Sequence, residues 1–211
     1  MKIRHLFLAI LCFALLAGCQ KAAEQSRFIM PDVVVAVAPF TQPTQTSELL
    51  SGFIPEGQKA VSSEDLAKLN ALFRSKLHAD KHRYVFLTQA DIDGKMAKDE
   101  RGRRNALITW AERARKAGAD MIVVPQVIEF HERVGGEAGA LSAAAVNEDF
   151  YLIDARKPAT LLHRAHFAEE QKSLVNDLTQ IGSFFRRGGK WVSALELAGE
   201  GMDKAVEELG L

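Results

Sequence analysis

The chain has 211 residues, of which 47% are hydrophobic and 26% are charged, and its 27 basic residues balance its 27 acidic residues. This composition is that of an ordinary globular protein. Because the charges are mixed and almost cancel, the sequence lacks the basic footprint that nucleic-acid binding requires, and we expect no nucleic-acid partner.

The N-terminal segment has the layout of a secretory signal that ends at a cysteine. A basic start, Met1–His5, precedes an uninterrupted apolar run, Leu6–Leu16, and small residues then lead to Cys19. As a helix this run spans about 17 Å, well short of the ~30 Å hydrocarbon core, so a transmembrane helix is the weaker alternative. The segment Leu16-Ala17-Gly18-Cys19 resembles the lipobox of bacterial lipoproteins. This resemblance implies that residues 1–18 are removed and that Cys19 carries the lipid, palmitate included.

Removal of this signal changes the charge and the thiol content of the chain. Loss of Lys2 and Arg4 leaves 25 of the 27 basic residues against 27 acidic ones. Cys12 leaves with the signal and Cys19 carries the lipid. No thiol then remains for a disulfide, a thiolate metal site or a cysteine nucleophile, although the compartment permits disulfides.

The mature chain is expected to consist of a tether and one domain. Residues 19–30 are polar and lack periodicity, as a tether does. Residues 31–211 suffice for one apolar core, so we expect a single periplasmic domain there. Gln20, and not aspartate, follows the cysteine, which by resemblance to bacterial lipoproteins favours the outer membrane. The anchor is a lipid, so the domain is tethered to the membrane surface.

The first half of the domain starts with a buried strand and a capped helix. Val33–Phe40 is a continuous β-branched run, typical of a strand that is buried on both faces. Residues 47–61, which include Phe53, form an irregular apolar segment that is either a loop over the core or a partner-contact surface. Ser62 begins a helix, because Asp65 completes a capping box with it.

Hydrophobic periodicity and helix caps then predict an alternation of strands and helices. The predicted elements are a strand at Tyr84–Leu87, a capped turn at Thr88–Asp91, a helix at Asn105–Ala117, strands at Met121–Phe130, Ala143–Asp154 and Thr160–Phe167, and helices at Leu174–Ile181 and from Ser193 to Gly210. Pro125 suggests an edge position or a bulge, and Gly135–Gly139 a flexible connection. This order predicts a single α/β domain with a small mixed sheet of about five strands, flanked by helices.

Several of these segments together resemble a group of bacterial envelope lipoprotein domains. They are the strand that ends in Ala38-Pro39-Phe40, the segment Ala117–Pro125, and the strand that ends in Tyr151–Ala155. Over residues 31–170 the chain looks like the TolB amino-terminal domain, the curli secretion lipoprotein CsgG and the penicillin-binding-protein activator lipoproteins. The resemblance implies a small mixed sheet with flanking helices that serves assembly or protein binding, and not catalysis.

The histidines do not form a recognisable metal or catalytic motif. His78 and His82 lie where a helix is expected to end, and His163 and His166 should point to opposite faces of a strand. His131 is expected at the surface beside a strand end. The sequence also lacks the P-loop, the dinucleotide fingerprint and the serine-hydrolase motifs. We therefore expect no catalytic residue, no metal and no cofactor.

The most unusual local composition lies just before the last predicted helix. Three cations and three aromatic residues surround a Gly-Gly turn there, namely Phe184, Phe185, Arg186, Arg187, Lys190 and Trp191. Aromatic residues and arginine are enriched in binding hot spots, so this segment is a candidate partner contact. The alternative is that its aromatic side chains pack onto the sheet.

These observations predict a lipid-anchored, periplasm-facing protein that binds another envelope protein as a non-catalytic assembly or accessory factor. One alternative is a subunit of an oligomeric export complex, in which copies of the chain associate. The other is a periplasmic hydrolase or a small-ligand binder.

Overall fold

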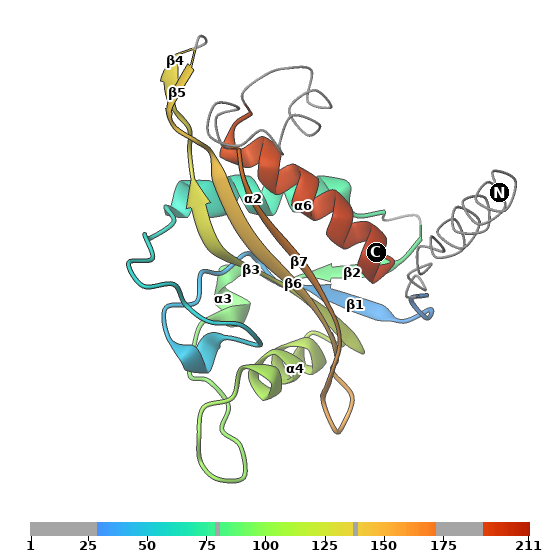
Figure 1. The fold of residues 1–211 in the computed structure, drawn as a ribbon. Coiled ribbons are helices and arrows are strands. Elements are labelled where there is room, and N and C mark those ends of the chain that lie inside the picture. Colours follow the sequence, from blue (N-terminus) through green and yellow to red (C-terminus); the bar gives the residue numbers. More distant parts are fainter. Residues whose placement is uncertain (1–28, 79–80, 137–138, 172–191) are drawn as a thin grey trace, which may run out of the picture.

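The computed structural model describes residues 29–78, 81–136, 139–171 and 192–211, with a five-stranded sheet at its centre (Figure 1). Its strands are β1 (Val34–Val37), β2 (Arg83–Phe86), β3 (Met121–His131), β6 (Ala145–Asp154) and β7 (Thr160–Glu170). They are ordered β2-β1-β3-β6-β7. β1 is parallel to β2 and β3, whereas β3, β6 and β7 are antiparallel neighbours. The predicted α/β class with a mixed sheet is confirmed.

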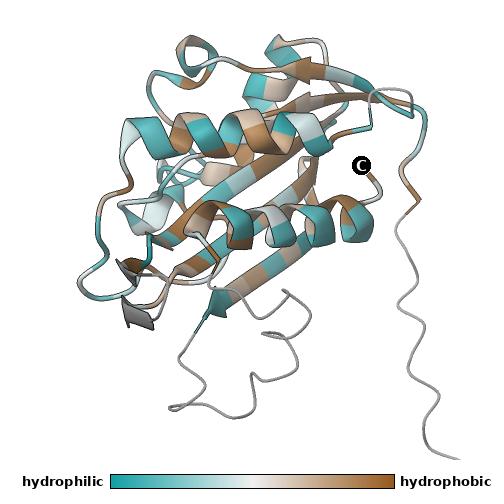
Figure 2. Ribbon diagram, turned by 90° about the horizontal axis from the view of Figure 1, so that it is seen from above, coloured by the Kyte–Doolittle hydropathy of each residue, from teal (hydrophilic) through white to brown (hydrophobic). Residues whose placement is uncertain are grey.

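Helices cover both faces of this sheet. α2 (Ser63–Lys76) and α6 (Ala194–Leu209) pack together on one face, and α4 (Ala106–Lys116) lies on the other (Figure 1, Figure 2). A short helix, α3 (Gln89–Ile92), follows β2. Alternate side chains of each strand supply the two apolar layers, which makes β1 buried on both faces as predicted. Across the described residues, no helix is long and apolar enough to cross a membrane.

Side-chain caps fix where the long helices begin, as the sequence predicts. Ser62 Oγ accepts a hydrogen bond from the amide of Asp65 at 3.0 Å, and Ser193 Oγ accepts one from the amide of Glu196 at 3.1 Å. Each cap satisfies an amide that has no acceptor within the first helical turn. α6 ends at Gly210, whose φ of +68° lies in the left-handed region that favours glycine.

Pro125 lies in the interior of the sheet, so the predicted edge position is wrong. Its carbonyl accepts a hydrogen bond from the amide of Thr41 at 3.3 Å, on the side of β1. The N–H and C=O of an extended residue point to the same side, so the missing N–H also faces this side. The cost is small because β1 has already ended at Val37. The register of β3 against β6 shifts nearby, between Val127 and Glu129.

The glycine-rich segment after β3, which we expected to be a flexible hairpin connection, takes part in a small hairpin. β4 (Val134–Gly136) pairs antiparallel with β5 (Gly139–Ser142) beyond the end of the main sheet (Figure 1). The last β3–β6 pair, His131 with Ala145, brings the two chain segments together and so favours this pairing. The helix predicted at Leu174–Ile181 lies outside the described residues.

The irregular segment between β1 and α2 crosses the face of the sheet that α4 covers. It contains a 3-10 helix, η2 (Thr46–Glu48), and Leu50 packs against the core beside α4. The side-chain amide of Gln58 donates to the carbonyl of Ile128 at 2.8 Å. The segment is therefore a loop over the core, which is one of the two alternatives that the sequence left open, but its Phe53 is 75% exposed.

Candidate functional site

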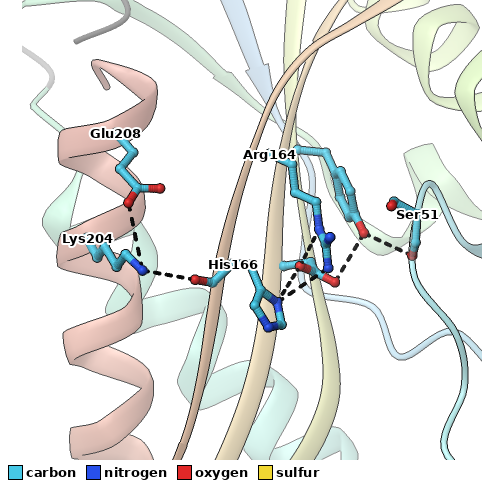
Figure 3. A network of polar contacts seen from close by, with 7 residues as sticks. Ser51, Arg164, His166, Lys204 and Glu208 are labelled. Carbon is cyan, nitrogen blue, oxygen red and sulfur yellow. Dashed lines mark hydrogen bonds and ion pairs between the residues drawn. The ribbon is translucent and has the colours of Figure 1, made fainter. Parts of the chain in front are cut away.

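A group of four polar side chains lies on the α4 face of β6 and β7 (Figure 3). Asp149 is directly opposite His166 in the ladder, and Tyr151 is directly opposite Arg164. Residues two apart on a strand share a face, so the two pairs form one cluster. We call these four residues the Asp149 cluster.

The Asp149 carboxylate is the centre of this cluster. Its Oδ1 accepts a hydrogen bond from Arg164 Nε at 2.8 Å and lies 2.9 Å from His166 Nδ1. The Tyr151 hydroxyl lies 3.1 Å from Asp149 Oδ2 and 3.2 Å from the carbonyl oxygen of Ser51 (Figure 3). The Asp149 side chain is 3% exposed, so these interactions replace the hydrogen bonds that water would otherwise make with the carboxylate.

The surroundings of two members of the cluster, Tyr151 and Arg164, shift their pKa values. Burial and the nearby Asp149 carboxylate raise the pKa of Tyr151 well above its ordinary value, so its hydroxyl remains protonated and available as a donor. Hydrogen bonding to Asp149 raises the pKa of Arg164, which keeps the guanidinium charged. The side chains of Arg164 and His166 are 34% and 46% exposed. The cluster therefore fixes a cation and an imidazole at the protein surface.

The loop beside the cluster adds an exposed aromatic residue. Gly52 takes a φ of +84°, and a Cβ built on it would lie 3.8 Å from Arg164 Nη2, so the loop runs close to this guanidinium. The next residue is the exposed Phe53. We call Phe53, Arg164 and His166 the Phe53 surface. Aromatic residues beside arginine are typical of binding hot spots.

A separate cavity of about 290 Å³ lies beyond the end of β1 on the same face. It is enclosed by the start of the β1–α2 segment, the loop after α3, and α4. Among its lining residues are Gln42, Asp93, Trp110, Arg113 and Gln126. Gln126 reaches the cavity from β3, and its side-chain amide donates to the carbonyl of Glu48 at 2.9 Å. The lining of the cavity combines polar and charged side chains with the indole of Trp110.

The histidines that lie close together in the sequence do not form a common site in the structure. α2 ends at Lys76, so His78 and His82 do not share a helix, and His82 Nε2 lies 2.9 Å from the carbonyl of Gly210. His131 pairs with Glu129 at 3.0 Å. No group of three or more potential metal-ligating side chains occurs within the ranges that the structure describes.

His163 and His166 lie on opposite faces of β7, as the sequence predicts. His166 contacts Asp149 on the α4 face, whereas Ala165 belongs to the core beneath α6. Alternation along the strand places His163 on the same side as Ala165. The two histidines therefore cannot bind one metal ion together.

The other predicted site residues lie where the structure gives no description. Cys19, the predicted lipid attachment site, precedes the described residues. The candidate partner contact, Phe184, Phe185, Arg186, Arg187, Lys190 and Trp191, falls in the gap between β7 and α6. Both assignments stay predictions.

The Asp149 cluster was missed at the sequence level, although a signal for it exists. Asp149 and Tyr151 alternate on one predicted strand, and Arg164 and His166 alternate on the next. A buried carboxylate two residues from a tyrosine, facing an arginine and a histidine across a hairpin, is a pattern that can be searched for.

Comparisons with known proteins give no family for this chain. No protein-family model and no curated protein matches it. Solved structures with a related arrangement include the PelC dodecamer from Paraburkholderia phytofirmans, at 14% identity and a TM-score of 0.47, covering 86% of this chain and 93% of that one. Another is the lipoprotein GNA1162 from Neisseria meningitidis, at 15% identity and a TM-score of 0.38, covering 75% and 97%. At this level of similarity they assign neither a family nor a function, and the TolB, CsgG and activator resemblance stays an expectation.

Proposed function

We propose that this chain is a lipid-anchored protein of the bacterial envelope, which faces the periplasm and binds another envelope protein as a non-catalytic assembly or accessory factor. The lipobox at Cys19 supports the anchor, and Gln20 supports the outer membrane. The observation that carries the binding role is the Phe53 surface. The proposal includes no catalytic step and no cofactor.

The Phe53 surface combines exposure with a fixed geometry. The carbonyl of Ser51 accepts from the Tyr151 hydroxyl, and this contact holds the loop beside Phe53 against the sheet. Arg164 is held by the buried Asp149 carboxylate. Because these groups are already positioned, a partner loses little conformational entropy in ordering them. The phenyl ring and the guanidinium can then contact an apolar and an anionic group of the partner together.

Photocrosslinking in intact cells tests this proposal. A photoreactive residue at Phe53 is expected to give one dominant adduct with an envelope protein, and a second probe at Trp191 tests the segment that precedes α6. Val134 is a matched control, because it is also an exposed apolar residue but lies on the β4–β5 hairpin. An adduct at Phe53 that also disappears in an Arg164→Ser variant supports the proposal. Equal adducts from Phe53 and Val134, or none from Phe53, contradict it.

A second candidate function is self-association into an oligomeric assembly, and the position of β7 favours it. β7 spans Thr160–Glu170 and is an edge strand of the sheet. A long edge strand can pair with a strand of another chain. Lys204 Nζ donates to the carbonyl of His166 at 3.2 Å and so occupies one acceptor along β7. A native mass well above that of a monomer, reduced by an Ala168→Pro change in β7, would support this candidate.

A further inference from the structure

The cavity at Gln126 lies at the point where the chain reverses its direction across the sheet. From β1 the chain passes through α2 to β2 on one side, and from β2 it passes through α4 to β3 on the other side of β1. α2 and α4 cover opposite faces, so the carboxyl end of β1 opens into a crevice beside β3. In open α/β sheets, ligands bind in crevices of this kind. Thr41, Gln42 and Gln126 line the cavity at this point.

Gln126 lines the cavity and carries a hydrogen-bond acceptor that is unused among the described residues. The residue is 1% exposed, and its side-chain nitrogen donates to the carbonyl of Glu48. Its Oε1 is buried and has no hydrogen-bond partner among the residues that the structure describes. A buried carbonyl oxygen in this state destabilises the fold unless a donor reaches it. A ligand that carries an N–H or O–H group can supply that donor.

Arg113 brings an unpaired cation to the same cavity. Its guanidinium stacks on the indole of Trp110 at 4.7 Å and donates to the carbonyl of Ile92. No carboxylate in the described part of the chain lies within ion-pairing distance of it. Burial lowers the pKa of Arg113, and the Asp93 carboxylate, which also lines the cavity, partly offsets this effect from beyond ion-pairing distance. A bound carboxylate can form the bidentate pair that the guanidinium lacks.

We infer that this cavity binds a free α-amino acid, with the ligand carboxylate on Arg113 and a ligand N–H donor on Gln126 Oε1. Asp93 also lines the cavity and disfavours an inorganic dianion, but it suits the ammonium group of a zwitterion. A volume of about 290 Å³ is at the lower end of the range for small-molecule sites and fits a ligand of this size. The Trp110 ring also lines the cavity, next to the Arg113 guanidinium.

Trp110 provides the readout for a binding experiment. The chain has two tryptophans, so a Trp191→Phe background leaves Trp110 as the single indole. The full chain in detergent is titrated with each proteinogenic L-amino acid while the Trp110 fluorescence is recorded. Acetate and ethanolamine are titrated in the same way, because each carries only one of the two charged groups. A saturable change with at least one amino acid, stronger than with either control compound, is the expected result.

Matched variants then test the assigned contacts. Arg113→Met is expected to weaken binding by about tenfold or more, as loss of a charge-assisted hydrogen bond does. Arg74→Met is the control, because Arg74 also stacks on an aromatic ring, that of Phe86 at 3.9 Å, but does not line this cavity. Gln126→Met removes the acceptor, and its melting temperature is measured to show that the variant is folded.

Two results would overturn the assigned site, and two others would overturn the assigned ligand class. One is the lack of a saturable fluorescence change with every amino acid in a folded protein. The other is equal loss of binding in Arg113→Met and Arg74→Met. Acetate that binds as tightly as the amino acids would overturn the assigned ligand class. Tighter binding of alanyl-alanine than of alanine would indicate that the cavity binds a peptide terminus, and would also overturn the assigned ligand class.

Discussion

Glu148 is a carboxyl group enclosed between the sheet and α6. It lies on β6 between core residues and is 0% exposed. Neither of its carboxyl oxygens has a hydrogen-bond partner in the described part of the chain. Desolvation therefore raises the pKa of Glu148 well above its ordinary value of 4.5. Between pH 4.5 and this raised pKa, the folded protein holds a proton on Glu148 that the unfolded chain releases.

This proton makes stability depend on pH in a direction that can be tested. Above pH 4.5 and below the native pKa of Glu148, unfolding releases one proton, so rising pH favours the unfolded chain. The free energy of unfolding is expected to fall by about 1.4 kcal/mol per pH unit in this interval. Glu148→Gln removes the ionisable group, so the variant should be more stable than the wild type near neutral pH. Urea unfolding of the wild type and the variant at several pH values measures the pH dependence and the difference in stability.

Glu112→Gln is the control for this experiment, because Glu112 is exposed on α4. It should leave the pH profile of the wild type unchanged. A Glu148→Gln variant that keeps the wild-type slope would show that Glu148 is ionised in the folded protein.

Asp149 differs from Glu148 because its buried carboxylate has partners. Asp149→Asn keeps the shape but removes the charge that holds Arg164 and His166. We expect it to lower the free energy of unfolding by about 1–3 kcal/mol. Asp203→Asn is the matched control, since Asp203 pairs with Lys76 at 2.6 Å but is 66% exposed, and should cost less than about 1 kcal/mol. Equal losses in the two variants would contradict the central role of Asp149.

Two glycines of α6 provide a matched pair of substitutions that tests how closely this helix packs on the sheet. A Cβ on Gly201 would lie 2.7 Å from Phe167 Cδ1 and 2.8 Å from Glu148 Oε2, whereas a Cβ on Gly199 would lie 3.5 Å from Leu72 Cδ2. Gly201→Ala should therefore force α6 away from β7 and destabilise the protein by about 1–3 kcal/mol. Gly199→Ala should stabilise it by up to about 1 kcal/mol through helix propensity. Thermal melts of the two variants check the opposite signs.

The same elements show what can be predicted from the sequence. The starts of α2 and α6 follow from Ser62 and Ser193, because a capping side chain acts on amides within its own helical turn. The edge position predicted from Pro125 is wrong, because a missing N–H costs little wherever the neighbouring strand has ended. Where β1 ends beside Pro125 depends on residues far away in the sequence.

The Asp149 cluster could not be placed because a register shift precedes it. β6 and β7 pair Asp154 with Thr160 at the turn, but the register shifts between Leu152 and Ile153. Without this shift, Asp149 would be opposite Ala165, and Arg164 would be opposite Phe150 in place of Tyr151. A slip of one residue moves every later side chain of a strand to the other face. The sequence alone does not reveal such a slip.

At the scale of the whole molecule, the anchor is the feature that sequence supports most directly. Cys19→Ser should abolish lipid labelling and release the protein from the membrane fraction, since the proposed lipid on Cys19 is the proposed attachment. Cys12→Ser is the matched control, because Cys12 lies in the apolar run of the signal and leaves the lipobox intact. Labelling of both variants with a fatty-acid analogue, followed by fractionation, measures the difference. Lipid-dependent membrane attachment of Cys19→Ser would overturn the assignment.

The interior position of β1 has a mechanical consequence for the anchor that we propose. A pull from the membrane would reach the domain through the chain that enters β1 at Val34. β1 is parallel to both neighbours, so force along it would load the β1–β2 and β1–β3 hydrogen bonds in shear. These bonds would then have to break together, and not one after another. The domain should therefore resist extension from its N-terminus better than extension from β7, which has one paired edge in the sheet.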